Sequence, residues 1–309
     1  MLKSVFVQRR AASLVEVVIV IAILGILFAL VSGGIHKVRT ASLRLHSENN
    51  LRQISLAFHT YCAGTNDTIK GLPNTVSKSH TFYNTNSVFG LLTQVLMPRT
   101  FPTDRTLSSD EIAEYQTPTI AVYLSPADPS LHFNALIDKK FAKISYAVNM
   151  TAFDGNITFP FSLPDGTSST ISFAERYWYT EFSTNDDKTR NNTCYFDYSE
   201  VFRPDQMGNN SRRATFADRA SSDVYPVSDG NGRSVGSVPV LPSPLPPGKP
   251  FAFRPPVNDS WCDRLQTPHP AGLPVAMFDG SVRTLNPNID ERIFWSLVTP
   301  AGGEVVGDY

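Results

Sequence analysis

The residues best suited to chemistry lie near the C-terminus of this 309-residue chain. His269 precedes an Asp279-Gly280 pair with nine residues between them, and Cys262 lies just upstream. Histidine and aspartate together serve general acid–base catalysis, whereas cysteine and histidine together serve zinc binding. Two further ligands at metal-site spacing are missing for zinc, and Asp-Gly is also a common turn sequence. We therefore expect His269, Asp279 and Gly280 to be structural.

Oxygen ligands for a metal ion occur elsewhere in the chain. Asp165-Gly166-Thr167-Ser168 and the separate Asp218, Asp223 and Asp229 offer carboxylates and hydroxyls. They lack the regular spacing of a calcium-binding loop, so solvated loops are favoured over a calcium site and we expect no cofactor. The net charge of -1 and pI of about 6.6 provide no basic field for nucleic acid.

Glu16 is the most unusual ionisable residue, because it lies at the edge of an apolar run. Val17–Ile35 contains no charge, and the leader before it contains Lys3, Arg9 and Arg10. A helix of this length spans about 28 Å, close to the thickness of a bilayer core. The leading cations favour a cytoplasmic N-terminus, and a signal peptide would have a shorter apolar region. A carboxylate at this place is expected to have a cationic partner.

The segment from Ala11 to Val20 resembles the cleavage and methylation segment of type IV prepilins and type II secretion pseudopilins. The resemblance implies cleavage between Ala11 and Ala12 by a prepilin peptidase, which makes Glu16 the fifth residue of the mature chain. Its implied partner is the new N-terminal amine of a neighbouring subunit. The family normally has Gly where Ala11 stands and Phe or Met where Ala12 stands.

The apolar run continues into a second helical pattern. Leu51, Ile54, Phe58 and Tyr61 share one helical face, and proline is absent until Pro73. We expect one helix over residues 12–62, with a transmembrane half at 14–35, after a leader at 1–11. The glycines Gly25, Gly33 and Gly34 favour either local bending or close helix packing in the membrane.

Residues 63–309 are expected to form a β-rich extracytoplasmic domain. Alternating or β-branched segments predict strands at 119–124, 143–148 and 170–174, and Asp279-Gly280 predicts a type I′ hairpin over 275–285. Ile289, Ile293 and Leu297 predict a terminal helix. Residues 239–256 are rich in proline and indicate a surface excursion. The fold class is therefore α+β, with a pilin-like long N-terminal helix packed on an antiparallel sheet.

Three cysteines allow at most one disulfide within the chain. They are Cys62, Cys194 and Cys262, and the topology places them in an oxidising compartment. Cys194 with Cys262 is our expectation, because both lie in the irregular second half, although connectivity cannot be deduced from sequence.

Three ordered motifs resemble the DUF1559 family of prepilin-type proteins. They are Asn49–His59, Leu163–Glu175 and the His269 element that ends in Asp279-Gly280. The resemblance gives Asp165, Gly166, Thr167, Ser168 and Glu175 a place among its motif residues, and we expect these to be structural. Many members have two cysteines where this chain has Ser47 and Ser125. The resemblance implies that those cysteines bond each other, so this chain would have a looser tie between helix and domain.

A dense aromatic segment, Phe173–Phe182, permits either a sheet core or an exposed surface that stacks on sugars. The core is favoured. The predicted function is a non-enzymatic pseudopilin or minor-pilin-like subunit, single-pass in the inner membrane, with neighbouring subunits as partners. The alternative is a membrane-tethered extracytoplasmic protein that binds a ligand or glycan and never polymerises.

Overall fold

The computed structural model describes residues 14–65, 68–70, 88–97, 120–132, 143–153, 156–184, 187–194, 209–213, 215–217, 224–228, 234–239, 250–260 and 264–303. The helices are α1 (Leu14–Gly64), α2 (Val88–Leu96) and α4 (Glu291–Val298), with 3-10 turns η1 (Ala121–Tyr123), η2 (Pro129–His132) and η3 (Val257–Asp259). The chain divides into two compact units, Met1–Leu43 and Arg44–Tyr309.

The strands all belong to the second unit. They are β1 (Thr68–Lys70), β2 (Tyr146–Asn149), β3 (Asn156–Thr158), β4 (Ile171–Glu175), β5 (Tyr179–Thr184), β6 (Asp187–Cys194), β7 (Asn209–Arg213), β8 (Thr215–Phe216), β9 (Val224–Ser228), β10 (Ser234–Pro239), β11 (Ala252–Phe253), β12 (Gln266–Thr267), β13 (Leu273–Met277) and β14 (Val282–Leu285).

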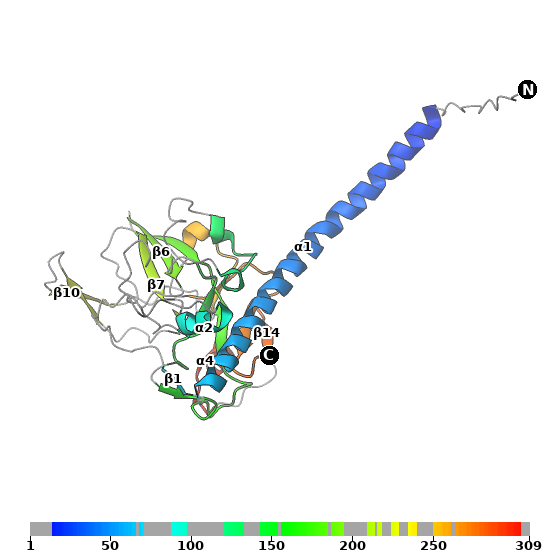
Figure 1. Ribbon diagram of the computed structural model, residues 1–309. Helices are drawn as coiled ribbons and strands as arrows, with labels where there is room; N and C mark the ends of the chain where they lie inside the picture. The colour runs from blue at the N-terminus through cyan, green and yellow to red at the C-terminus, as the bar shows by residue number, and fades with distance from the viewer. Residues whose placement is uncertain are drawn as a thin grey trace, which may run out of the picture. The chain divides into compact units, whose positions relative to one another are not determined.

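The long N-terminal helix is confirmed over the described residues, because α1 runs unbroken from Leu14 to Gly64 (Figure 1). In the first unit, the described side chains from Leu14 to Ser42 are exposed. One helix, α1, is long and apolar enough to cross a membrane. Residues 12 and 13 of the predicted helix lie outside the described part.

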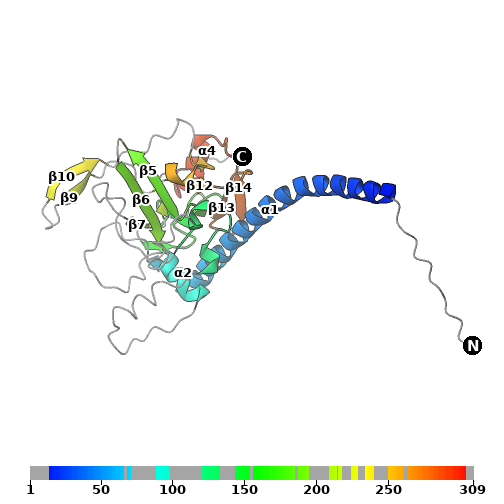
Figure 2. The ribbon, with the colours of Figure 1, turned by 90° about the horizontal axis from the view of Figure 1, so that it is seen from above.

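A five-stranded sheet forms the centre of the second unit, in the order β14-β13-β4-β2-β8. Its neighbours are antiparallel except β8, which pairs with β2 in parallel. The strands predicted at 143–148 and 170–174 correspond to β2 and β4. A second sheet, β5-β6-β7, lies beside the first (Figure 2). The α+β class with a mainly antiparallel sheet is thus confirmed.

The predicted C-terminal hairpin forms, but its turn differs from type I′. β13 and β14 pair with Val275 opposite Arg283, whereas a two-residue turn at Asp279-Gly280 would place Val275 opposite Thr284. Gly280 has a φ of 84°, whereas Asp279 is not among the described non-glycine residues with positive φ. The Gly280 N–H donates to Met277 O at 3.0 Å, and the Met277 N–H donates to Ser281 O at 2.8 Å. This is a turn closed by one left-handed glycine, as in hairpins with a bulge, so only Gly280 needs conformational freedom.

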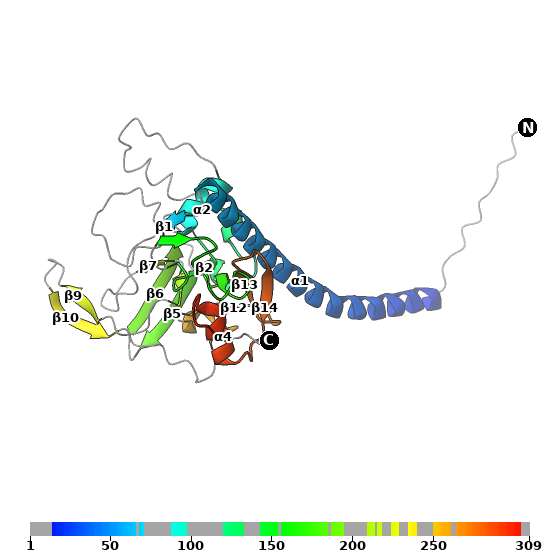
Figure 3. The same cartoon turned by 90° about the horizontal axis from the view of Figure 1, so that it is seen from below.

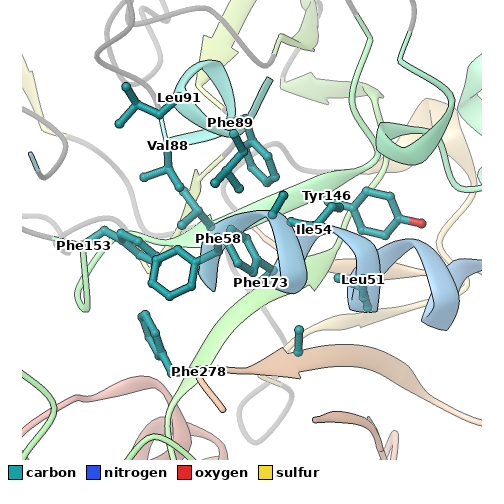
Figure 4. Packing of buried hydrophobic residues seen from close by; sticks show 14 of the residues in the cluster. Leu51, Ile54, Phe58, Val88, Phe89, Leu91, Tyr146, Phe153, Phe173 and Phe278 are labelled. Atoms are coloured by element: carbon teal, nitrogen blue, oxygen red, sulfur yellow. The ribbon is translucent and has the colours of Figure 1, made fainter. Parts of the chain in front are cut away.

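One face of the central sheet packs on the second half of α1 and on α2. Leu51, Ile54 and Phe58 of α1 are buried, as their spacing predicted. Figure 4 shows Phe58 among the rings of Phe153, Phe173 and Phe278. All three rings meet Phe58 edge-on, with ring centroids 5.6–6.0 Å apart. Burial of each of these apolar α1 side chains contributes about 1.5–3 kcal/mol to the free energy of folding. This figure is an upper bound, because a compact unfolded chain already buries part of the same surface.

The other face of the sheet packs on α4, which confirms the predicted terminal helix (Figure 3). Phe294, Leu297 and Val298 join the buried cluster that contains Val275 and Met277. The helix begins at a favourable cap, because the Asp290 carboxylate accepts the Arg292 N–H at 2.8 Å. The central sheet is therefore covered on both faces, which explains why every residue of β4 and β13 is buried.

The strand predicted at 119–124 is wrong over its described residues. Ala121–Tyr123 is the 3-10 turn η1, and the Tyr123 N–H donates to Ile120 O. The Tyr123 side chain is fully buried, and its hydroxyl donates to Phe89 O of α2 at 2.8 Å. Tertiary burial of this ring outweighs the strand propensity of the segment.

The proline-rich stretch at 239–256 is described only at its two ends. Pro239 is the last residue of β10, and β11 pairs in parallel with β12. Phe251 is buried against Phe294 at a ring distance of 6.2 Å. The last residues of the expected excursion therefore belong to the packed domain, because Phe251 supplies apolar surface to the α4 face.

Candidate functional site

Glu175 and His269 form a buried acid–imidazole pair at one end of the central sheet. Glu175 is the last residue of β4, and His269 lies in the loop between β12 and β13. His269 Nε2 is 3.2 Å from both Glu175 oxygens, and the side chains are 1% and 0% exposed. Both were predicted as motif residues, but nothing in the sequence placed them in contact across 94 positions.

Two serine hydroxyls donate to the same carboxylate oxygen. Ser47 Oγ of α1 lies 2.8 Å from Glu175 Oε1, and Ser125 Oγ after η1 lies 2.5 Å from it. The Tyr146 hydroxyl of β2 lies 3.1 Å from Ser47 Oγ. We call these five residues, Ser47, Ser125, Tyr146, Glu175 and His269, the Glu175 junction. It joins α1, the η1 segment, β2, β4 and the β12–β13 loop.

The Glu175 junction is relevant to the expectation that α1 is only loosely attached to the folded domain where Ser47 and Ser125 replace two cysteines. The Ser47 and Ser125 hydroxyls both donate to Oε1 of the buried Glu175 carboxylate, so the two serines share a noncovalent link. A buried carboxylate that lost its donors would be costly. In place of a disulfide, the chain therefore has a shared acceptor that holds α1 to the η1 segment.

The electrostatic surroundings suit a structural role for the junction. Burial raises the pKa of Tyr146, and the nearby Glu175 charge raises it further, so the phenol stays protonated and can donate. All five side chains are almost completely buried. A substrate cannot reach His269 or Glu175 in this conformation, because neither presents surface to solvent.

A second buried carboxylate, Asp128, lies in the segment that begins with Ser125. Asp128 accepts four hydrogen bonds of 2.6–2.8 Å, from the N–H and hydroxyl of Ser130, the hydroxyl of Ser145 and the N–H of Trp178. Burial raises the pKa of Asp128 to about 6, and the hydrogen bonds partly oppose that rise. The loop from Ser125 to Ser130 is thus fixed at both ends by buried carboxylates.

Lys143 lies near the same region, with its Nζ 4.4 Å from the centre of the Trp178 ring. Burial lowers the pKa of Lys143, and the charge of Asp128 opposes this effect. The ammonium also donates to Leu131 O at 3.3 Å. The Lys143 ammonium therefore joins the turn η2 to the Trp178 ring.

The loops that contain Asp165-Gly166 and Asp279-Gly280 are joined by a backbone hydrogen bond. The Asp279 N–H donates to Thr167 O at 3.0 Å, and Asp279 Oδ1 accepts the Ser281 N–H at 2.8 Å. Gly166 has a φ of 99° and its N–H closes a turn onto Leu163 O. Ser168 is exposed. The two loops therefore brace each other and are separate from the Glu175–His269 pair.

Asp165 fixes the last described residues of the chain. Its carboxylate accepts the N–H groups of Gly302 at 2.7 Å and Gly303 at 3.0 Å. Its oxygens therefore already have partners other than a metal ion. In the described part of the chain, no group of three histidine, cysteine or acidic side chains could hold a metal. The other candidate ligands, Asp218, Asp223, Asp229 and Cys262, lie outside the described residues.

The disulfide prediction cannot be judged from the described residues, because they include neither Cys262 nor the side chain of Cys194. Cys62 is buried in the α1 face of the core. Ala11 and Ala12 also lie outside the described part. Glu16 is an exposed residue in the first turn of α1.

The aromatic segment belongs to the core, as favoured from sequence. Phe173, Tyr177, Trp178 and Tyr179 are each at most 1% exposed. The described rings of this segment therefore offer no surface for stacking on a sugar.

A Gly-x-Ser-x-Gly sequence, which in some hydrolases carries a catalytic serine, occurs at Gly232–Gly236. Ser234 begins β10 and pairs with Ser228 of β9. It lacks the strand-to-helix turn that exposes a catalytic serine.

Sequence reasoning missed Tyr146 and Asp128 as members of buried polar networks. The signal for Asp128 was its place three residues after Ser125, in a Ser-Pro-Ala-Asp segment of small and polar residues. Tyr146 looked like an ordinary strand aromatic, and only the fold places its hydroxyl against Ser47.

Comparison with known proteins gives one family. No curated protein and no solved structure matches the chain. A family model described as "Protein of unknown function (DUF1559)" matches residues 36–292, which is well over half of the chain. The matched range includes α2, the whole Glu175 junction and both Asp-Gly loops. The chain therefore belongs to the DUF1559 family.

Proposed function

We propose that the chain is a non-enzymatic pseudopilin or minor-pilin-like subunit of a filament related to type IV pili or type II secretion. The observation that supports this proposal is the continuous helix α1. Its first part exposes apolar side chains such as Ile19 and Leu27, at 53% and 51% exposure. Its second part supplies Leu51 and Phe58 to the core of the folded unit.

The topology follows from this division of α1. Residues 14–35 cross the inner membrane, the N-terminus is cytoplasmic and the second unit is extracytoplasmic. A prepilin peptidase removes residues 1–11, and the new Ala12 amine of one subunit neutralises Glu16 of a neighbour. The burial of Glu175 and His269 supports an architectural role for the family's ionisable residues, and burial of the aromatic segment counts against glycan stacking there.

The experiment compares Glu16→Gln and Glu16→Ala with the native chain in cells that have an active prepilin peptidase. Both variants should leave the second unit folded and reduce incorporation into sheared filaments, because an apolar assembly then lacks one charge of the pair. Glu291→Gln is the matched control, since Glu291 is an exposed carboxylate in the first turn of α4. Mass spectrometry of the mature N-terminus should find Ala12.

Normal incorporation of both Glu16 variants would reject the charge pairing. An intact Met1 terminus on a chain that stays in the membrane would instead favour a tethered protein that does not polymerise.

A further inference from the structure

A group of basic residues follows the apolar run on α1. His36, Lys37 and Arg39 follow Ile35 directly, and all three side chains are exposed. In the part of the chain that the structure describes, no carboxylate lies within ion-pair distance of Lys37 or Arg39. The next acidic residue along the chain is Glu48, which pairs with Arg44 at 3.4 Å. Two cations thus lie uncompensated at the end of an apolar helix.

Their distance from the apolar run decides what they can meet. With a rise of 1.5 Å per residue, Lys37 lies about 3 Å and Arg39 about 6 Å beyond Ile35 along the helix axis. Each headgroup layer of a bilayer is about 5–7 Å thick outside the hydrocarbon core. If α1 crosses the membrane at Val17–Ile35, both cations therefore lie within the headgroup layer.

We propose that Lys37 and Arg39 bind the headgroups of anionic phospholipids. Positions 37 and 39 are about 200° apart around a helix, so the two cations face different lipids and each binds its own phosphate group. The guanidinium of Arg39 can hold a phosphate with two parallel hydrogen bonds, whereas the ammonium of Lys37 acts as a point charge. The lipid phosphate is thus the anionic partner of Lys37 and Arg39 that the described part of the chain does not provide.

This site has a particular consequence if the leader is removed. Lys3, Arg9 and Arg10 then leave the chain, so Lys37 and Arg39 are the only lysine or arginine side chains left close to the two ends of the apolar segment. The mature helix would be held at a fixed depth by lipid contacts on the side of the folded unit. The inference depends on the membrane insertion included in the proposed function, but not on filament assembly.

The test measures lipid binding to the full chain in detergent by native mass spectrometry, with phosphatidylglycerol and phosphatidylcholine as the two probes. The native chain should bind phosphatidylglycerol more tightly. Lys37→Gln and Arg39→Gln should each weaken that binding about fivefold, and the double variant should lose the preference. Added salt should weaken the native preference, because exposed charges are screened.

A matched double variant, Arg52→Gln with Arg292→Gln, removes the same charge from exposed positions of the second unit. It should keep the preference for phosphatidylglycerol. Equal loss in both double variants, or no preference in the native chain, would overturn the headgroup site while leaving the filament proposal intact. A chain that stays in solution without detergent would overturn membrane insertion and this site together.

Discussion

Ser47 Oγ on α1 donates a 2.8 Å hydrogen bond to Glu175 Oε1 at the end of β4, across 128 positions of sequence. Both side chains are fully buried. The bond joins the helix that defines the N-terminal architecture to the central strand of the folded unit. Because His269 and Ser125 use the same carboxylate, the stability of this attachment depends on one residue, Glu175.

Glu175→Ala should destabilise the second unit strongly. The change leaves Ser47, Ser125 and His269 buried without their acceptor, which typically costs about 3–5 kcal/mol. Glu175→Gln keeps a carbonyl acceptor of the same shape and should cost about 1–3 kcal/mol. Ser47→Ala removes a single donor and should cost about 1 kcal/mol. The measurement is the free energy of unfolding of the full chain from denaturant titration.

Ser42→Ala is the control for these variants, because Ser42 is an exposed serine of the same helix. A Glu175→Ala chain as stable as the Ser42→Ala chain would show that the junction contributes nothing.

A disulfide should form when cysteine replaces both serines of the junction. Ser47 Oγ and Ser125 Oγ are each within 2.8 Å of Glu175 Oε1, so their side chains converge on one point. Oxidation of the Ser47→Cys, Ser125→Cys variant should give a faster band on a non-reducing gel. A loop of this length stabilises by about 4.5 kcal/mol in the chain-entropy model, less the loss of two donors to Glu175.

The Ser47→Cys, Ser130→Cys variant is the matched control, since Ser130 is buried but donates to Asp128 instead. It should remain reduced under the same conditions. Crosslinking in the control and none in the first pair would contradict the described convergence.

Stability should fall between pH 4 and pH 6 because of Asp128. Burial raises its native pKa to about 6, above the 3.8 expected in the unfolded chain. The native state therefore binds the proton more tightly. This contribution is fully present below pH 3.8 and is lost as the pH rises through 6, by on the order of 3 kcal/mol.

Asp128→Asn removes this titration, and the midpoint of thermal unfolding should then vary less over the same pH range. The variant should also be less stable at pH 4, because its amide nitrogen faces N–H and O–H donors. Parallel pH profiles of native and variant chains would assign the titration to another group.

The long helix and the hairpin could be predicted because their signals are local. Leu51, Ile54 and Phe58 repeat with the helical period, and Asp279-Gly280 marks a tight turn between two strand-like runs. The turn type could not be predicted, because the sequence does not show whether Asp279 also takes a positive φ. The register of β13 with β14 and the hydrogen bond from the Asp279 N–H to Thr167 O decide the turn type.

The candidate site was predictable only as a set of residues. Glu175 and His269 were identified from motifs, but their contact depends on the pairing of β4 with β13 and on the packing of α1. The strand predicted around Tyr123 failed for a related reason. Burial of its ring against α2 is a long-range effect that local propensity does not contain.

Gly280→Val should destabilise the C-terminal hairpin. The residue has a φ of 84°, which a β-branched side chain adopts only with strain of about 1–3 kcal/mol. Space is a smaller concern, since a Cβ at this position would lie 3.6 Å from His59 Nε2, an ordinary contact. Gly280→Asn tests this distinction, because asparagine tolerates the left-handed region and adds comparable bulk. The valine variant should unfold at a clearly lower temperature than the asparagine variant, and equal losses would assign the effect to crowding at His59 rather than to the backbone.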